Sequence, residues 1–155
     1  YTFAELCKEA EETDYITSRI DVNNKCFLAP ENMTEAIKSY CNNNDLIIPD
    51  TAGEIAAVVY KSLADSYADT VMQIEKNLDI TYDAIYVIGG GANAGYLNQL
   101  TADSTGKTVV AGPAEATAIG NIMAQMIADS VFKNLKEARA CVRDSFDIKR
   151  FEQKR

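Results

Sequence analysis

The chain of 155 residues contains no histidine. This absence excludes Ser-His-Asp and Cys-His nucleophilic catalysis and any metal site that depends on imidazole ligands. Chemistry in this chain must therefore use carboxylates, hydroxyl groups, backbone groups or a metal that a ligand brings with it. No apolar run approaches the roughly 20 residues that a membrane-spanning helix needs, and no signal peptide is visible, so we expect no membrane partner.

Basic residues and closely spaced cysteines are also scarce. The 15 Lys and Arg against 23 Asp and Glu leave a net charge of −8, which disfavours nucleic-acid binding because a surface that follows phosphates needs clustered Lys and Arg. The four cysteines, at positions 7, 26, 41 and 141, form no Cys-x-x-Cys pair. This spacing indicates neither a disulfide framework nor a structural zinc site. We expect reduced thiols that act as small buried side chains in a cytoplasmic protein.

What the sequence does contain is typical of one globular α/β domain. Hydrophobic residues make up 47% and charged residues 25% of the chain. Residues 1–80 have helical patterns, residues 81–130 alternate strand, glycine turn, helix, strand and helix, and residues 131–155 form a last helix and a charged tail. Because the chain begins at Tyr1 directly in a helical pattern, we expect it to be part of a longer protein.

The first half is predicted to contain helices at residues 2–12, 31–42 and 51–79. Thr51 followed by Glu54 has the spacing of a capping box at the start of the third helix. Large apolar residues then recur at helical spacing and predict one continuous stripe along it: Ile55, Val59, Leu63, Tyr67, Val71, Ile74 and Leu78.

The second half is predicted to contain a short parallel strand pair, at about residues 84–88 and 107–111, joined by a helix at 94–104. The apolar composition of the first strand favours burial on both faces. A further helix is predicted to start at Pro113, with Glu115 in its first turn, and the last helix covers 134–145. Since two strands are too few for a stable sheet, we expect further strands from an upstream part or self-association of the chain.

The most informative feature is the turn Gly89-Gly90-Gly91-Ala92-Asn93, which follows the first predicted strand and precedes a helix. Open α/β sheets bind nucleotides at such strand-to-helix turns. One candidate ligand is a dinucleotide, since the turn satisfies G-x-G-x-x-A. However, the second strand ends in Val110-Ala111-Gly112-Pro113, without the acidic residue that holds a ribose.

The other interpretations of this turn are an ATP site, in which the glycines lie against the adenosine, and a tight turn without a ligand. Three adjacent glycines carry an entropic cost that a plain turn does not require, and this favours a ligand. Elsewhere, we expect Asp65 on the solvated surface, Asp103 in a structural role, and Glu115 capping its helix or reaching a ribose. Gly120 indicates a close approach of helix to strand, and a stripe beginning at Met123 is expected in the core.

A block of 35 residues, 87–121, resembles the carboxy-terminal domain of the FGGY family of carbohydrate kinases. The segments that carry the resemblance are Leu97-Asn98-Gln99-Leu100, Ala111-Gly112-Pro113, Glu115-Ala116-Thr117 and Ile119-Gly120-Asn121, with Ile20-Asp21-Val22-Asn23 and Phe27-Leu28-Ala29-Pro30 upstream. The resemblance implies part of an actin-like ATPase (ribonuclease H-like) domain.

The resemblance to this family implies an enzyme that transfers the γ-phosphoryl group of ATP, with Mg²⁺, to a hydroxyl group of a sugar. It places Gly90 against ATP, with Gly89, Gly91 and Asn93 as its neighbours. The catalytic Asp and the sugar-binding residues are expected upstream of residue 1. We therefore predict that the chain alone is inactive and binds nucleotide, and that the sugar substrate binds only to the longer enzyme. The alternative from another class is a non-catalytic actin-like or dinucleotide-binding module.

Overall fold

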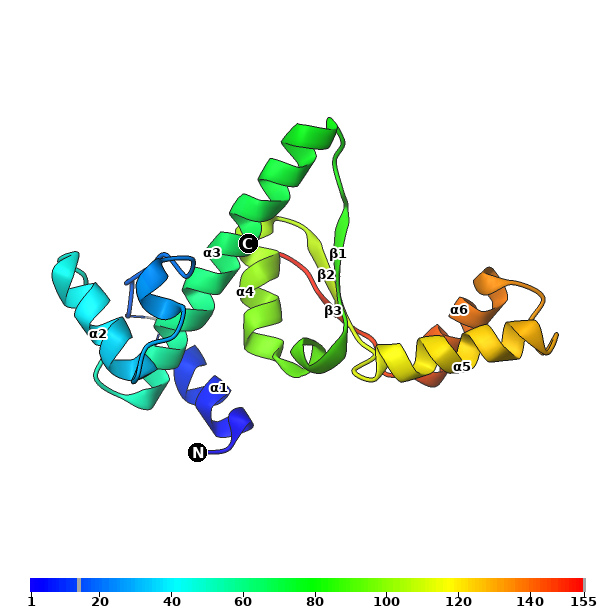
Figure 1. Ribbon diagram of the computed structural model, residues 1–155, viewed down its shortest axis with the longest axis horizontal. Coiled ribbons are helices and arrows are strands. Elements are labelled where there is room, and N and C mark those ends of the chain that lie inside the picture. The colour runs from blue at the N-terminus through cyan, green and yellow to red at the C-terminus, as the bar shows by residue number, and fades with distance from the viewer. Residues whose placement is uncertain (14, 155) are drawn as a thin grey trace.

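The computed structural model describes residues 1–13 and 15–154, and its longest helix, α3 (Ala52–Leu78), connects the two halves (Figure 1). Helices α1 (Phe3–Glu11) and α2 (Met33–Asn43) and the short 3-10 helix η1 (Lys25–Phe27) lie around the first half of α3. The second half of α3 leads to the sheet. The predicted helical first half and α/β second half are therefore both present.

The capping box predicted at the start of α3 is confirmed. The amide of Glu54 donates to the Thr51 hydroxyl oxygen at 3.2 Å, and the Thr51 amide donates to the Glu54 carboxylate at 3.1 Å. The same carboxylate also accepts hydrogen bonds from the Tyr15 hydroxyl and the Asp50 amide. These two bonds, together with that from the Thr51 amide, hold the pKa of Glu54 below its usual range. Thr2 and Glu5 form an equivalent box at the start of α1.

The buried face of α3 differs from the predicted stripe. Tyr67, Ile74 and Leu78 of that stripe are exposed, whereas the buried positions hold mostly small or polar side chains: Gly53, Ala56, Ala57, Val58, Lys61, Ser62 and Ala64. At the start of α3 the reason is close packing with α1, since a Cβ added at Gly53 would lie 2.8 Å from the Cβ of Glu9. Large side chains do not fit between helices at that separation. Further along, the segment before η1 lies over α3, where the Ile16 carbonyl accepts from Lys61 and the Ile20 amide donates to Ser62.

The main core of the helical half combines α2, α3 and the segment between α1 and α2. Its buried members are Ile16, Ile20, Ile37, Cys41 and Val58. All four cysteines are free thiols, and burial raises the pKa of Cys41. Cys26 is exposed, however, so the expectation of buried cysteines is wrong there: it lies in η1 at the surface, where its amide donates to the Asn24 side chain.

The sheet has the order β1-β2-β3 (Figure 1). Strand β1 (Ala84–Val87) pairs in parallel with β2 (Thr108–Ala111), as predicted, and helix α4 (Gly95–Thr105) connects them. Strand β3 (Lys149–Phe151) pairs antiparallel with β2 and was missed, because three residues, two of them charged, resemble a solvated tail. Charged side chains are common on edge strands, where they discourage unwanted pairing.

The prediction that β1 is buried on both faces is wrong within this chain. Ile85 and Val87 are half-buried on the face that they share with the fully buried Val109, but Tyr86 and Ile88 on the other face are exposed. The helix expected beside the sheet, α5 (Ala116–Ala128), packs instead with α6 (Leu135–Ser145). The two form a hairpin that extends away from the sheet (Figure 1).

Helix α5 also begins later than predicted, at Ala116 instead of Pro113. The Gly112 amide donates to the Val87 carbonyl at 2.9 Å, and the Pro113 carbonyl accepts from the Gly89 amide at 3.4 Å, so both residues extend the pairing of β2 with β1 and do not begin the helix. Glu115 occupies the N-cap position, but its side chain makes no capping hydrogen bond.

Two further predictions for α5 are wrong. A Cβ on Gly120 would meet no atom within 4 Å, so no close helix–strand approach explains this glycine. The stripe that begins at Met123 is only half-buried because α5 lies beside α6 and not against the sheet.

Candidate functional site

The glycine turn follows β1 as the 3-10 helix η2 (Gly89–Asn93) and leads directly into α4. Gly89 has φ +76°, a conformation that side chains rarely adopt, and its amide bonds to Pro113 beyond the end of β2. The turn therefore lies at the carboxyl ends of two parallel strands and at the amino end of a helix, as predicted. Open α/β sheets place ligands at this position.

The buried amide of Asn98 holds the turn from beneath. Its Nδ2 lies 3.3 Å from the carbonyl oxygens of both Gly91 and Ala92, and the residue is only 3% exposed. Sequence reasoning did not assign this role. The available signal was an amide side chain in the first turn of a predicted helix, directly after the glycine turn.

All four residues predicted to bind a cofactor lie together in this turn. Gly90, Gly91 and Asn93 are exposed and Gly89 is half-buried. A Cβ on Gly90 would meet nothing within 4 Å, whereas one on Gly91 would lie 3.5 Å from the Val87 side chain. Gly90 is thus an open position on the surface of the turn.

The turn is uncharged, since residues 84–102 include no Asp, Glu, Lys or Arg. Its polar groups are backbone amides and carbonyls, together with the amide of Asn93. Helix α4 starts without a side-chain capping hydrogen bond, which leaves its first amide groups available to an acceptor. This chemistry suits a ligand that is recognised through backbone contacts, and it supplies no general base.

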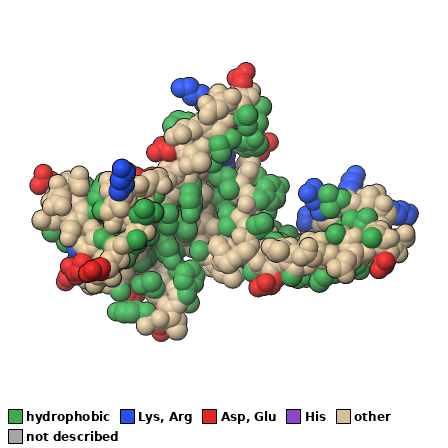
Figure 2. Space-filling model, viewed as in Figure 1, with side chains coloured by type: hydrophobic (Ala, Val, Ile, Leu, Met, Phe, Trp, Pro, Cys, Tyr) green, Lys and Arg blue, Asp and Glu red, His purple; other side chains and the backbone are tan. Residues whose placement is uncertain are grey.

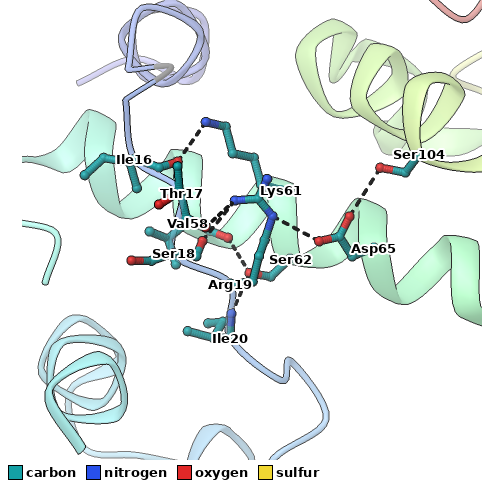
Figure 3. A network of polar contacts seen from close by, with 10 residues as sticks. All are labelled: Ile16, Thr17, Ser18, Arg19, Ile20, Val58, Lys61, Ser62, Asp65 and Ser104. Atoms are coloured by element: carbon teal, nitrogen blue, oxygen red, sulfur yellow. Dashed lines mark hydrogen bonds and ion pairs between the residues drawn. The ribbon is translucent and has the colours of Figure 1, made fainter. Parts of the chain in front are cut away.

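A network of polar contacts, shown in Figure 3, joins α3 to the segment before η1 and to α4. Asp65, expected on the solvated surface, accepts from Arg19 Nε at 3.0 Å and from the Ser104 hydroxyl at 3.3 Å. Nearby, the ammonium group of the buried Lys61 donates to the Ile16 carbonyl at 2.9 Å. The expectation for Asp65 is therefore incomplete: it is exposed but links α3 to two other segments.

Asp103 has the structural role that was predicted. Its carboxylate accepts from Gln99 Nε2 at 3.0 Å and from the Lys154 amide at 2.7 Å, which ties the residues after β3 to α4. Neither contact reaches the glycine turn. Asp103 therefore contributes to the sheet's support and not to a ligand site.

Two cavities lie in the helical half, away from the glycine turn. One of about 350 Å³ is lined by Asn24, Cys26, Tyr40 and neighbouring polar residues, and an apolar one of about 360 Å³ lies between α1, α2 and α3. Within residues 1–13 and 15–154 no cluster of three acidic or thiol side chains could hold a metal ion. In the same residues, no helix combines the length and apolar character needed to cross a membrane.

The fold and the turn together define a part of an actin-like, ribonuclease H-like α/β domain. Residues 2–128 match the C-terminal domain of the FGGY family of carbohydrate kinases. The chain therefore belongs to this family, and the resemblance found in its sequence is confirmed. Helix α6 and strand β3 lie beyond the matched range.

Individual relatives are rhamnulokinases. The chain is 47% identical over 154 residues to the rhamnulokinase of Bacillus subtilis (strain 168), covering 99% of this chain and 32% of the relative. It is 45% identical over 148 residues to the rhamnulokinase of Oceanobacillus iheyensis, covering 96% and 31%. It is 38% identical over 151 residues to that of Lactiplantibacillus plantarum, covering 97% and 31%. The chain thus spans about a third of the length of these relatives.

Proposed function

We propose that this chain is the nucleotide-side part of a rhamnulokinase, which transfers the γ-phosphoryl group of ATP to L-rhamnulose and forms L-rhamnulose 1-phosphate. The turn Gly89–Asn93 contacts the adenosine part of ATP, with Gly90 nearest to the ligand. The names of the relatives support the choice of sugar. The alternatives are kinases that act on xylulose, fuculose, gluconate or glycerol, since kinases of all these substrates share the family's ATP-binding half.

The observation that carries the nucleotide assignment is an open position at Gly90 that lies in the turn between β1 and α4. Among the glycines of the described residues, Gly89, Gly106 and Gly112 adopt positive φ and Gly90 does not, so the backbone of Gly90 tolerates a side chain. Packing does not require a glycine here either, since no atom lies within 4 Å of the place that a Cβ would occupy. A ligand that approaches the backbone closely explains why this position is a glycine, whereas the conformation and packing of the chain itself do not require one.

The residues of the turn are better suited to contact the adenosine of a nucleotide than to bind the Mg²⁺ that accompanies it. Backbone amides and the Asn93 side chain can donate to and accept from a purine or ribose, and nothing charged repels the ligand there. Mg²⁺ bound to ATP would supply charge neutralisation for phosphoryl transfer. The described residues hold no acidic cluster for that ion, so this chain's part is to bind and orient the adenosine.

Titration with ADP tests the proposal, using tyrosine fluorescence or calorimetry. Gly90→Val is expected to weaken ADP binding about tenfold or more, which corresponds to about 1.4 kcal/mol, while the fold is kept. Gly120→Val is the matched control, because that position is also open but lies on α5. Equal effects of both variants, or a preference of the wild type for NAD over ADP, would contradict the nucleotide assignment.

Catalytic activity is tested separately. Phosphoryl transfer needs a base, Mg²⁺ and phosphate donors held together, and the turn supplies neither a base nor a carboxylate ligand for Mg²⁺. We therefore expect no ATP-dependent phosphorylation of L-rhamnulose by residues 1–155 alone. A protein of the relatives' length should phosphorylate L-rhamnulose in preference to the other sugars named above, and a different preference would reassign the substrate.

A further inference from the structure

The glycine turn between β1 and α4 has few side chains of its own that could fix its shape. Gly89, Gly90 and Gly91 are adjacent, and glycine loses more backbone freedom on ordering than any other residue. Residues 84–102 carry no charged side chain, so this stretch offers none for an ion pair. Figure 2 shows hydrophobic side chains along β1, whereas Lys and Arg side chains gather over α6. The shape of the turn therefore depends on small packed side chains and on hydrogen bonds to its backbone.

The end of the turn next to α4 is the end that needs donors from outside η2. This 3-10 helix stops at Asn93, and α4 begins only two residues later, at Gly95. The last carbonyl groups of a helix find no partner within that helix, so those at the end of η2 must accept hydrogen bonds from other groups. The Gly91 carbonyl accepts from two of them, the Ala94 amide at 3.1 Å and the Asn98 side chain at 3.3 Å.

Asn98 is tied to the joint between η2 and α4 through both its main chain and its side chain. Its own amide donates to the Ala94 carbonyl at 2.9 Å, and its Nδ2 lies 3.3 Å from the carbonyl oxygens of Gly91 and Ala92. A side-chain amide nitrogen carries two hydrogens, so one Asn can serve both carbonyls. Because Asn98 is buried, loss of this donor would leave the carbonyls without a replacement from solvent. These contacts fix the angle at which the turn enters α4.

We propose that Asn98 is a positioning residue, which holds the turn Gly89–Asn93 in the shape that nucleotide binds. The inference rests on the proposed function of this turn. Asn98 is buried beneath the turn and acts through it, whereas Gly90 lies open on the surface. A flexible segment that becomes ordered on binding loses affinity, and a segment held in its bound shape beforehand avoids this cost. Asn98 therefore sets the affinity for ATP and ADP and takes no part in phosphoryl transfer.

Asn98→Asp tests this role in a protein of the relatives' length that contains residues 1–155. The substitution keeps the size of the side chain but replaces the donor amide with a carboxylate, which repels the two carbonyls. Calorimetry should show ADP binding weakened about threefold to tenfold, and the KM for ATP should rise by a similar factor. The kcat and the KM for L-rhamnulose should stay within about twofold of the wild type. A role in stability alone would instead reduce the amount of folded enzyme, which lowers kcat per molecule of protein and leaves KM unchanged.

Thr101→Val is the matched control, because Thr101 is buried to the same extent on α4, at 3% exposed, and its hydroxyl donates to the Leu97 carbonyl within that helix. It should leave ADP affinity unchanged. If Asn98→Asp does not fold, Asn98→Ser replaces it, since Ser keeps a shorter donor, and ADP binding should again be weaker than in the wild type.

The role of Asn98 is overturned by wild-type ADP affinity in the folded Asn98 variant, or by equal effects of Asn98→Asp and Thr101→Val on that affinity. Loss of the fold in both Asn98 variants also overturns it, because Asn98 would then serve the fold as a whole. Gly90→Val separates the two proposals. If it weakens ADP binding and the Asn98 variants do not, only the positioning role fails, whereas unchanged ADP binding in Gly90→Val removes the proposed function and this inference with it.

Discussion

The ammonium group of Lys107 lies 2.7 Å from a carboxylate oxygen of Glu75 and joins the end of α3 to the start of β2. The same ammonium donates to the Tyr82 carbonyl at 2.8 Å, and the Glu75 carboxylate accepts from the Tyr82 amide at 2.7 Å. The two side chains are 12% and 20% exposed. Together they fix the connection from α3 to β1, and hence the strand that carries the glycine turn.

The first prediction concerns the pH dependence of this pair. The hydrogen bond from Lys107, and then that from the Tyr82 amide, lower the pKa of Glu75 from its ordinary value of 4.5. A lowered folded-state pKa gives stability that is present above pH 4.5 and is lost as the pH falls through the folded value. Thermal unfolding from pH 7 to 3 should therefore show a smaller loss of stability for Glu75→Gln than for the wild type. Glu31→Gln, at an exposed position, should follow the wild type, and an unchanged profile of Glu75→Gln would contradict the prediction.

The second prediction contrasts two helical glycines. Gly53→Ala should destabilise the protein by about 1–3 kcal/mol, because its new Cβ would lie 2.8 Å from the Glu9 Cβ and 3.1 Å from the Glu9 backbone. Gly120→Ala has open space and should stabilise α5 by about 0.5–1 kcal/mol. Urea denaturation measures both changes. A stabilising Gly53→Ala would show that α1 and α3 are not in such close contact.

The third prediction concerns Lys61, which is 8% exposed and donates to the carbonyls of Ile16 and Thr13 at 2.9 and 3.4 Å. Lys61→Met keeps the length of the side chain but removes this buried donor, so it should lower stability by about 1–3 kcal/mol. The exposed Lys76 on the same helix offers a control. Lys76→Met should change stability by less than about 0.5 kcal/mol, and equal effects would mean that the buried contacts contribute nothing measurable.

The fourth prediction tests β3 through two neighbouring residues. Phe151 is half-buried opposite Val109, whereas Arg150 is exposed opposite Val110. Phe151→Ala should destabilise the protein by about 2 kcal/mol through lost burial, and Arg150→Ala should have an effect within about 0.5 kcal/mol. Chemical denaturation with hydrogen exchange of the β2 amides measures both. If Phe151→Ala leaves stability and exchange unchanged, β3 does not contribute to the sheet.

The parts of this structure that were predictable depend on neighbours in the sequence. Thr51 and Glu54 cap α3 through contacts three residues apart, and the glycine turn is visible because a short apolar strand, three glycines and a helix follow one another. Asn98 was not assigned its role beneath the turn, because its acceptors are the backbone carbonyls of Gly91 and Ala92, which no side-chain motif marks.

The sequence alone determined the positions of most helices, the parallel strand pair and the family, because periodicity, caps and motifs are local. Only the tertiary structure decided which side of α3 is buried, since α1 packs closely at Gly53 and the segment before η1 contacts Lys61 and Ser62. It also decided that the last residues complete the sheet as β3, because the contact of Phe151 with Val109 joins segments about 40 residues apart. Such pairings depend on the packing of distant elements, and no short stretch of sequence encodes them.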